Sequence, residues 1–83
     1  MAKWSRNDGN HDDIREAFKQ LGYLVKSTAM VGEGFPDLVC FRPDVGVVLV
    51  EVKTDKGKLR HKQEAFVAKG WPVRMVRTVE DVT

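Results

Sequence analysis

The chain has 83 residues, of which 42% are hydrophobic and 31% are charged, with 14 Lys and Arg against 12 Asp and Glu. A chain of this length forms one domain with a modest core, and this composition excludes a disordered protein. No apolar run approaches the roughly 20 residues of a membrane span, so we expect no membrane partner. The single cysteine and the absence of a signal-peptide pattern at the start predict a cytoplasmic protein without an internal disulfide.

The first third of the chain predicts an arm, a helix and a strand. Residues 1–10 show no periodicity, so we expect a mobile arm or extended lead-in before a single domain over residues 11–83. Residues 10–21 place apolar side chains at helical spacing, with Asn10 or Asp12 as the cap and Gly22 as the stop. We expect a strand over residues 23–28 and a glycine-bearing loop over residues 29–35.

Residues 34–53 predict a β-hairpin. Two apolar, β-branched runs flank a short break that holds three turn formers, Pro43, Asp44 and Gly46. If the strands pair symmetrically about the break, Phe41 faces Val47 and Asp37 faces Glu51. Because side chains alternate between the faces of a strand, Asp37, Glu51 and Lys53 then point the same way.

This register places two carboxylates directly opposite each other, about 5 Å apart at Cβ. Like charges in such positions repel, and a purely structural strand would avoid them. A divalent cation between Asp37 and Glu51 explains the pair, because Mg²⁺ prefers oxygen ligands and is commonly held by one or two carboxylates. The ammonium of Lys53 can orient a water or stabilise charge on a phosphate.

The second half of the chain predicts a strand, a helix and a strand. Residues 47–50 are apolar at every position, which is typical of a central strand covered by helices on both faces. Residues 59–69 predict a helix ended by Gly70, with Gln63 on its inner face, and residues 72–76 predict the last strand. Gln63 needs a polar partner there, either the site or nearby backbone. The fold class is therefore α/β, a mixed sheet of about four strands flanked by helices in the order αβββαβ.

Positive charge is concentrated in the last third of the chain. Residues 53–77 carry eight Lys and Arg against two acids, which leaves a local charge of +6. A basic flank beside an acidic metal site suits the binding of a phosphate backbone, although a solvated surface is the plainer interpretation. The candidate DNA-binding residues are Lys56, Lys58, Arg60 and Lys62.

The motifs together resemble a known family of nucleases. Pro36-Asp37 followed by Glu51-Val52-Lys53 is similar to the PD-(D/E)xK signature. Gly-Phe-Pro-Asp-Leu-Val at 34–39 and Lys-Leu-Arg-His-Lys-Gln at 58–63 resemble the VRR-NUC branch, the virus-type replication-repair nucleases, over about residues 11–77. The resemblance implies a restriction-endonuclease-like core. Arg60 departs from the family, which usually has a serine there as the helix cap.

The resemblance also implies site residues and a cofactor. Asp37, Glu51 and the backbone carbonyl of Val52 would bind Mg²⁺ or Mn²⁺, Lys53 would assist hydrolysis, and Gln63 would support it. The first helix of the superfamily often supplies a further acid, but that position is His11 here, with Asp12 next to it. Either residue could serve the metal, and capping of the helix is the alternative.

The function implied is a metal-dependent, structure-specific DNA endonuclease. Compact relatives resemble homodimeric Holliday-junction resolvases, so we expect a homodimer acting on branched or junction-containing DNA, in the host cytoplasm if phage-encoded. One alternative is a flap or single-strand DNA nuclease in phage replication and repair. Another is a catalytically vestigial DNA-binding module, and the plainest is a small protein-binding domain with solvated charges.

Overall fold

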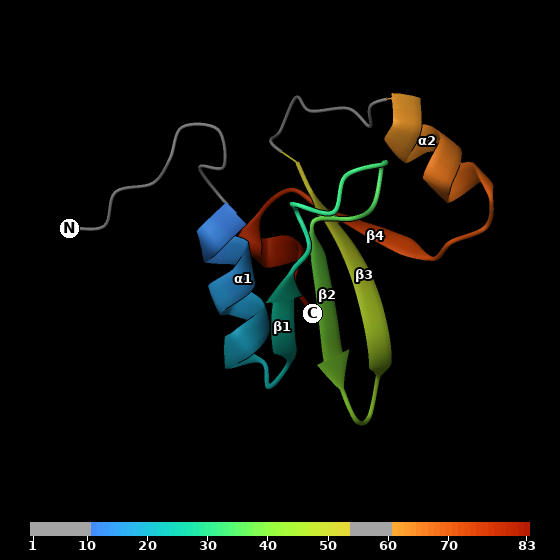
Figure 1. Ribbon diagram of the computed structural model, residues 1–83. Coiled ribbons are helices and arrows are strands. Elements are labelled where there is room, and N and C mark those ends of the chain that lie inside the picture. The colour runs from blue at the N-terminus through green and yellow to red at the C-terminus, as the bar shows by residue number, and fades with distance from the viewer. Residues whose placement is uncertain (1–10, 54–60) are drawn as a thin grey trace.

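The structure is a computed structural model that describes residues 11–53 and 61–83 (Figure 1). The expected arm at residues 1–10 and the candidate DNA contacts Lys56, Lys58 and Arg60 lie outside the described residues. The elements are α1 (His11–Gln20), β1 (Leu24–Ser27), β2 (Leu38–Arg42), β3 (Gly46–Val52), α2 (His61–Ala68), β4 (Val73–Val76) and a 3₁₀ turn, η2 (Val79–Asp81). This order confirms the predicted αβββαβ arrangement of an α/β fold.

The four strands form one mixed sheet in the order β1-β2-β3-β4. β1, β2 and β3 pair antiparallel, whereas β3 and β4 are parallel, with α2 in the connection between them. Parallel neighbours need such a crossover, because a tight turn can only join antiparallel strands. In the β2–β3 hairpin, Phe41 pairs with Val47 and Val39 with Leu49, which confirms the register predicted from the symmetric break.

One face of the sheet packs against α1 and holds the core. Ile14 and Phe18 of α1 are fully buried against alternate residues of the central strands, among them Leu38, Cys40 and Val50. Burial raises the pKa of the Cys40 thiol to about 11, although nearby Arg74 lowers it. The predicted helical periodicity of residues 10–21 therefore marks the face that closes the core.

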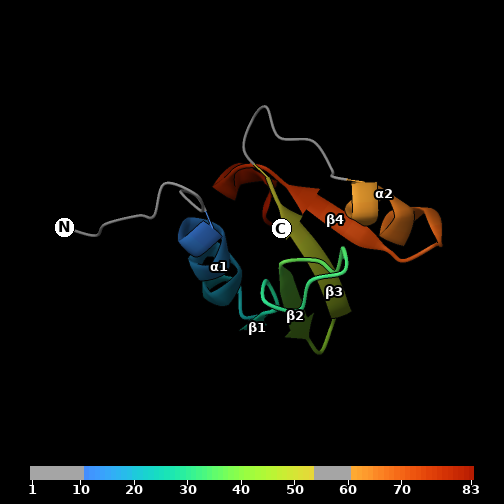
Figure 2. The same cartoon turned by 45° about the horizontal axis from the view of Figure 1, so that its top comes forward.

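The opposite face of the sheet is only partly covered. α2 lies next to β4 (Figure 2), and its Gln63 reaches Glu51 on this face. Three apolar side chains on this face, which are neighbours across β1, β2 and β3, remain exposed: Leu24 by 72%, Phe41 by 38% and Val47 by 64%. The expectation that helices cover β3 on both sides is wrong at this end. The reason is length, because an eight-residue helix spans only about 12 Å.

The C-terminal residues pack on the α1 side of the sheet. Arg74 of β4 lies 5.7 Å from the centre of the Phe18 ring and donates to the Thr83 hydroxyl at 2.9 Å. The Tyr23 hydroxyl donates to the Thr83 carbonyl at 3.0 Å. Arg74 belongs to the basic run of residues 53–77, yet its partners lie on the face opposite α2. No helix in the two described ranges is long and apolar enough to cross a membrane.

Candidate active site

Asp37 stands at the entrance to β2, where the chain is held on both sides. The Thr28 backbone N–H donates to the Asp37 carbonyl at 2.7 Å, and the Thr28 hydroxyl donates to the Pro36 carbonyl at 2.7 Å. The Asp37 carboxylate accepts the Val52 backbone N–H at 3.0 Å. Continuing the strand register by one step places Asp37 opposite Glu51, as the sequence predicted.

Glu51 is the buried acid of the site, with only 2% of its surface exposed. Burial, together with the negative charge of Asp37, raises the pKa of the Glu51 carboxyl to about 7. Lys53 and the Asp37 backbone N–H act in the opposite direction, because hydrogen bonds and a nearby cation stabilise the carboxylate. A buried carboxyl whose pKa is strongly raised beside a second acid is characteristic of functional sites.

Lys53 and Gln63 reach Glu51 from different elements. The Lys53 ammonium, directly after β3, is 3.4 Å from the Glu51 carboxylate Oε2. The Gln63 side-chain amide, in the first turn of α2, donates a hydrogen bond to the same oxygen. The structure therefore brings together Asp37, Glu51, Lys53 and Gln63, and the site supplies a polar partner for Gln63.

The donor set of this site suits a hard divalent cation. Asp37 and Glu51 supply two carboxylates, one of which resists ionisation because it is buried beside the other. A divalent cation would offset both the burial and the repulsion, and Mg²⁺ commonly takes only one or two protein carboxylates. The carbonyl of Val52 follows at the end of β3, and its part in metal binding stays a prediction.

The two candidate ligands on α1 have different surroundings. Asp12 is exposed and forms an ion pair with Arg15 at 3.4 Å, while His11 is half-buried. Among the described residues, no three His, Cys, Asp or Glu side chains are grouped so that they could hold a metal ion. A metal role for His11 or Asp12 therefore stays a prediction, and Asp12 acts within its own helix here.

Two features of the site do not follow from the sequence patterns. A Cβ on Gly34 would lie 2.4 Å from the Lys62 carbonyl oxygen, so this glycine lets the loop before β2 touch the backbone of α2. Thr28 braces the loop from the other side. In the sequence, Gly34 belongs to the Gly-Phe-Pro-Asp run. That run indicates a bent entry to the strand, but it does not indicate a contact with α2. Lys62 is exposed at the start of α2.

Comparison with known proteins agrees with this geometry. The VRR-NUC domain matches residues 4–70, which is most of the chain. The protein therefore belongs to the VRR-NUC family, whose nuclease domain implies activity on DNA and whose members are typically metal-dependent. No curated protein and no solved structure matches the chain.

Proposed function

We propose that this protein is a Mg²⁺- or Mn²⁺-dependent endonuclease that hydrolyses DNA phosphodiesters at Asp37 and Glu51. The observation that carries the proposal is the facing pair of carboxylates, with Glu51 almost fully buried and its pKa raised to about 7. A purely structural sheet gains nothing from such a pair. A nuclease needs it, because the cation held there balances the charge of the phosphate.

The residues around the pair have separable tasks. Asp37 and Glu51 would hold the cation, together with the Val52 carbonyl and, if the first helix contributes, Asp12 or His11. When bound, the cation supplies Lewis acidity and lowers the pKa of water. Lys53 would orient the attacking water and stabilise charge on the phosphate. Gln63 keeps Glu51 in place through its hydrogen bond.

We propose branched DNA as the substrate and a homodimer as the active form, as expected of a Holliday-junction resolvase. The exposed row of Leu24, Phe41 and Val47 supports self-association, because neighbouring apolar side chains on one face commonly mark an interaction surface. A two-fold dimer would present two active sites, which symmetric nicking of a junction requires. Val47→Glu should then convert the dimer to a monomer in sedimentation experiments while the isolated domain stays folded.

A cleavage assay tests the function. Labelled four-way junction, flap, single-stranded and duplex DNA would be incubated with the protein in Mg²⁺, Mn²⁺ or EDTA. Symmetric, metal-dependent nicks in the junction would support the resolvase. Cuts limited to flaps or single strands would keep the nuclease and reject the resolvase. DNA binding without cleavage in any metal would reject the nuclease in favour of a vestigial DNA-binding module.

A further inference from the structure

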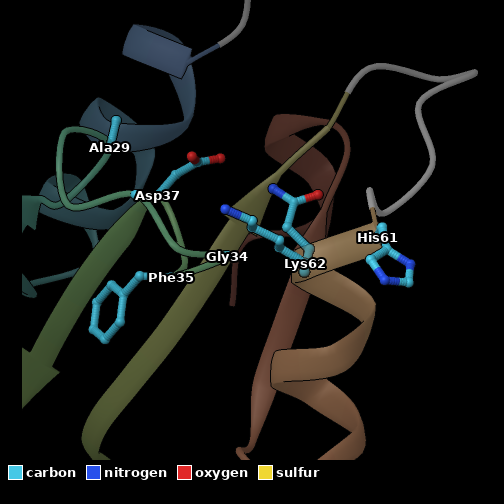
Figure 3. A pocket seen from close by; sticks show the side chains of 8 residues that line it. Ala29, Gly34, Phe35, Asp37, His61 and Lys62 are labelled. Atoms are coloured by element: carbon cyan, nitrogen blue, oxygen red, sulfur yellow. The ribbon is translucent and has the colours of Figure 1, made fainter.

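A pocket of about 330 Å³ adjoins the candidate active site on the α2 side. Its lining comes from the loop before β2 and from the start of α2, and includes Ala29, Gly34, Phe35, Asp37, Lys62 and Gln63 (Figure 3). Asp37 and Gln63 thus belong both to this pocket and to the group around Glu51. A molecule in the pocket would lie directly beside the position proposed for the scissile phosphate.

Backbone contacts fix the shape of this pocket. Gly34 has a φ of +81° and touches the Lys62–Gln63 peptide so closely that no side chain fits between them. The other end of the loop is tied by the two hydrogen bonds from Thr28. The walls are therefore held by main chain rather than by long side chains, and glycine allows a ligand to approach them closely.

The chemistry of the lining suits a small, flat, largely apolar group with polar edges. Glycine, alanine and phenylalanine make up one part of the wall, and the polar groups come from Asp37, His61, Lys62 and Gln63. This mixture is typical of sites for small organic ligands, whose volumes start at about 300 Å³. The volume admits one nucleobase and excludes a base pair that is still stacked in a duplex.

Lys62 supplies the charge that a nucleotide needs. Its side chain extends from the start of α2 toward the loop that carries Asp37 (Figure 3), and its neighbour His61 also lines the pocket. The ammonium of Lys62 attracts a phosphate directly, whereas the carboxylate of Asp37 attracts one only through the cation proposed there. A nucleotide would therefore place its base inward and its phosphate toward Lys62.

We propose that the pocket binds one unpaired nucleotide next to the scissile phosphate, so that the substrate is DNA with an unpaired base at the cleavage position. The proposal rests on the nuclease function above, and it specifies the substrate class. A base that enters a pocket of this size comes from a single strand or from an opened pair, because a stacked and paired base is not accessible to it. A flap, a single strand and an opened branch point would each provide such a base.

Base removal tests the proposal without altering the protein. An abasic nucleotide would replace each unpaired nucleotide around the cleavage position in turn, in flap, junction and single-stranded substrates. At one position the loss of the base should slow cleavage about tenfold, the effect of losing one stacked base. The substrate that shows this effect identifies the source of the unpaired nucleotide. If no position responds in any substrate, the proposal is wrong.

A paired substitution locates the effect in the pocket. Ala29→Phe would fill the space, and Ala65→Phe, exposed on α2 and outside the lining, is the matched control. With Ala29→Phe the intact and abasic substrates should be cut at rates within twofold of each other, whereas Ala65→Phe should keep the tenfold difference. A tenfold difference that persists in Ala29→Phe, shown to be folded by circular dichroism, would place the base elsewhere.

The failure of this proposal differs from the failure of the nuclease function. If the parent protein cuts no DNA in Mg²⁺ or Mn²⁺, the nuclease function is wrong. The pocket proposal is then tested by measuring the binding of the same oligonucleotides in EDTA by fluorescence anisotropy. Base removal should still weaken binding about tenfold in the parent and not in Ala29→Phe. Cleavage that is insensitive to base removal would reject the pocket alone.

Discussion

The two helices lie on opposite faces of one sheet and make very different contributions. α1 buries Ile14 and Phe18 completely and closes the core. α2 has no fully buried residue, yet it carries Gln63 to Glu51 and Lys62 to the pocket. Stability is therefore concentrated on the α1 face, and the candidate active site lies on the α2 face. Because the core lies on the other face, the charged side chains and the pocket on the α2 face cost the protein little stability.

The largest effect should come from the residues of the α2 face that act on the phosphate. Lys53→Ala and Asp37→Asn should each reduce cleavage at least about 100-fold, because each removes a charge aimed at the reacting group. Metal-free Asp37→Asn should melt at or slightly above the parent temperature, since repulsion of Glu51 is relieved and the Val52 N–H keeps an acceptor. Parental cleavage by either variant would show that the site is misassigned.

The second largest difference should be in stability, when a phenylalanine of each helix is replaced by alanine. Phe18→Ala should lower the free energy of unfolding by about 3–5 kcal/mol, because a fully buried ring leaves a cavity. Phe66→Ala, on α2, removes a half-buried ring that stacks on Trp71 at 5.2 Å and should cost less than half as much. Urea denaturation of both variants measures the difference. Equal losses would contradict the division between the faces.

The buried carboxyl of Glu51 should make stability depend on pH. Its pKa is about 7 in the folded protein against an ordinary value of 4.5, so the folded state binds the proton more tightly. Metal-free protein should therefore lose up to about 3 kcal/mol of stability as pH rises from 4.5 to 7. Glu51→Gln should abolish this loss, as thermal melts at several pH values would show. Added Mg²⁺ should raise the parent melting temperature more at pH 8 than at pH 5.5, since it binds the ionised form.

A smaller effect should separate two glycines with similar backbone angles. Gly34 and Gly46 have φ of +81° and +94°, but only Gly34 has atoms within 4 Å of an added Cβ. Gly46→Ala should cost about 1–2 kcal/mol for the left-handed conformation alone. Gly34→Ala should cost about 1 kcal/mol or more beyond that, because the Lys62 carbonyl must move. Cleavage should fall only in Gly34→Ala, as Gln63 shifts; an equal fall in both would show that α2 is not held by this contact.

The sequence was sufficient to predict the hairpin and the three side chains that it brings together at the candidate site. Alternation about a symmetric turn determines which side chains share a face, so the spacing alone places Asp37, Glu51 and Lys53 together. A polar residue on an apolar helix face made Gln63 a candidate, but the pattern left open whether its partner was the site or nearby backbone. These inferences depend on local spacing, which a single sequence displays directly.

Features that depend on how distant segments meet could not be predicted. The contact of Gly34 with α2 requires the position of a helix that follows some 28 residues later in the chain. The exposure of Val47 depends on how far α2 reaches across the sheet. The count of positive charges included Arg74, but only the packing on Phe18 shows which face that arginine serves.

The buried Cys40 can be used to measure how often the folded protein opens around β2. It is the only thiol in the chain, it lies at the centre of β2, and its pKa of about 11 leaves almost no thiolate at neutral pH. A thiol reagent can modify it only during excursions that separate α1 from the sheet. The labelling rate therefore measures how often such openings occur. Variants of the α2 face that keep the parent free energy of unfolding should leave this rate unchanged, whereas variants of the α1 face should increase it.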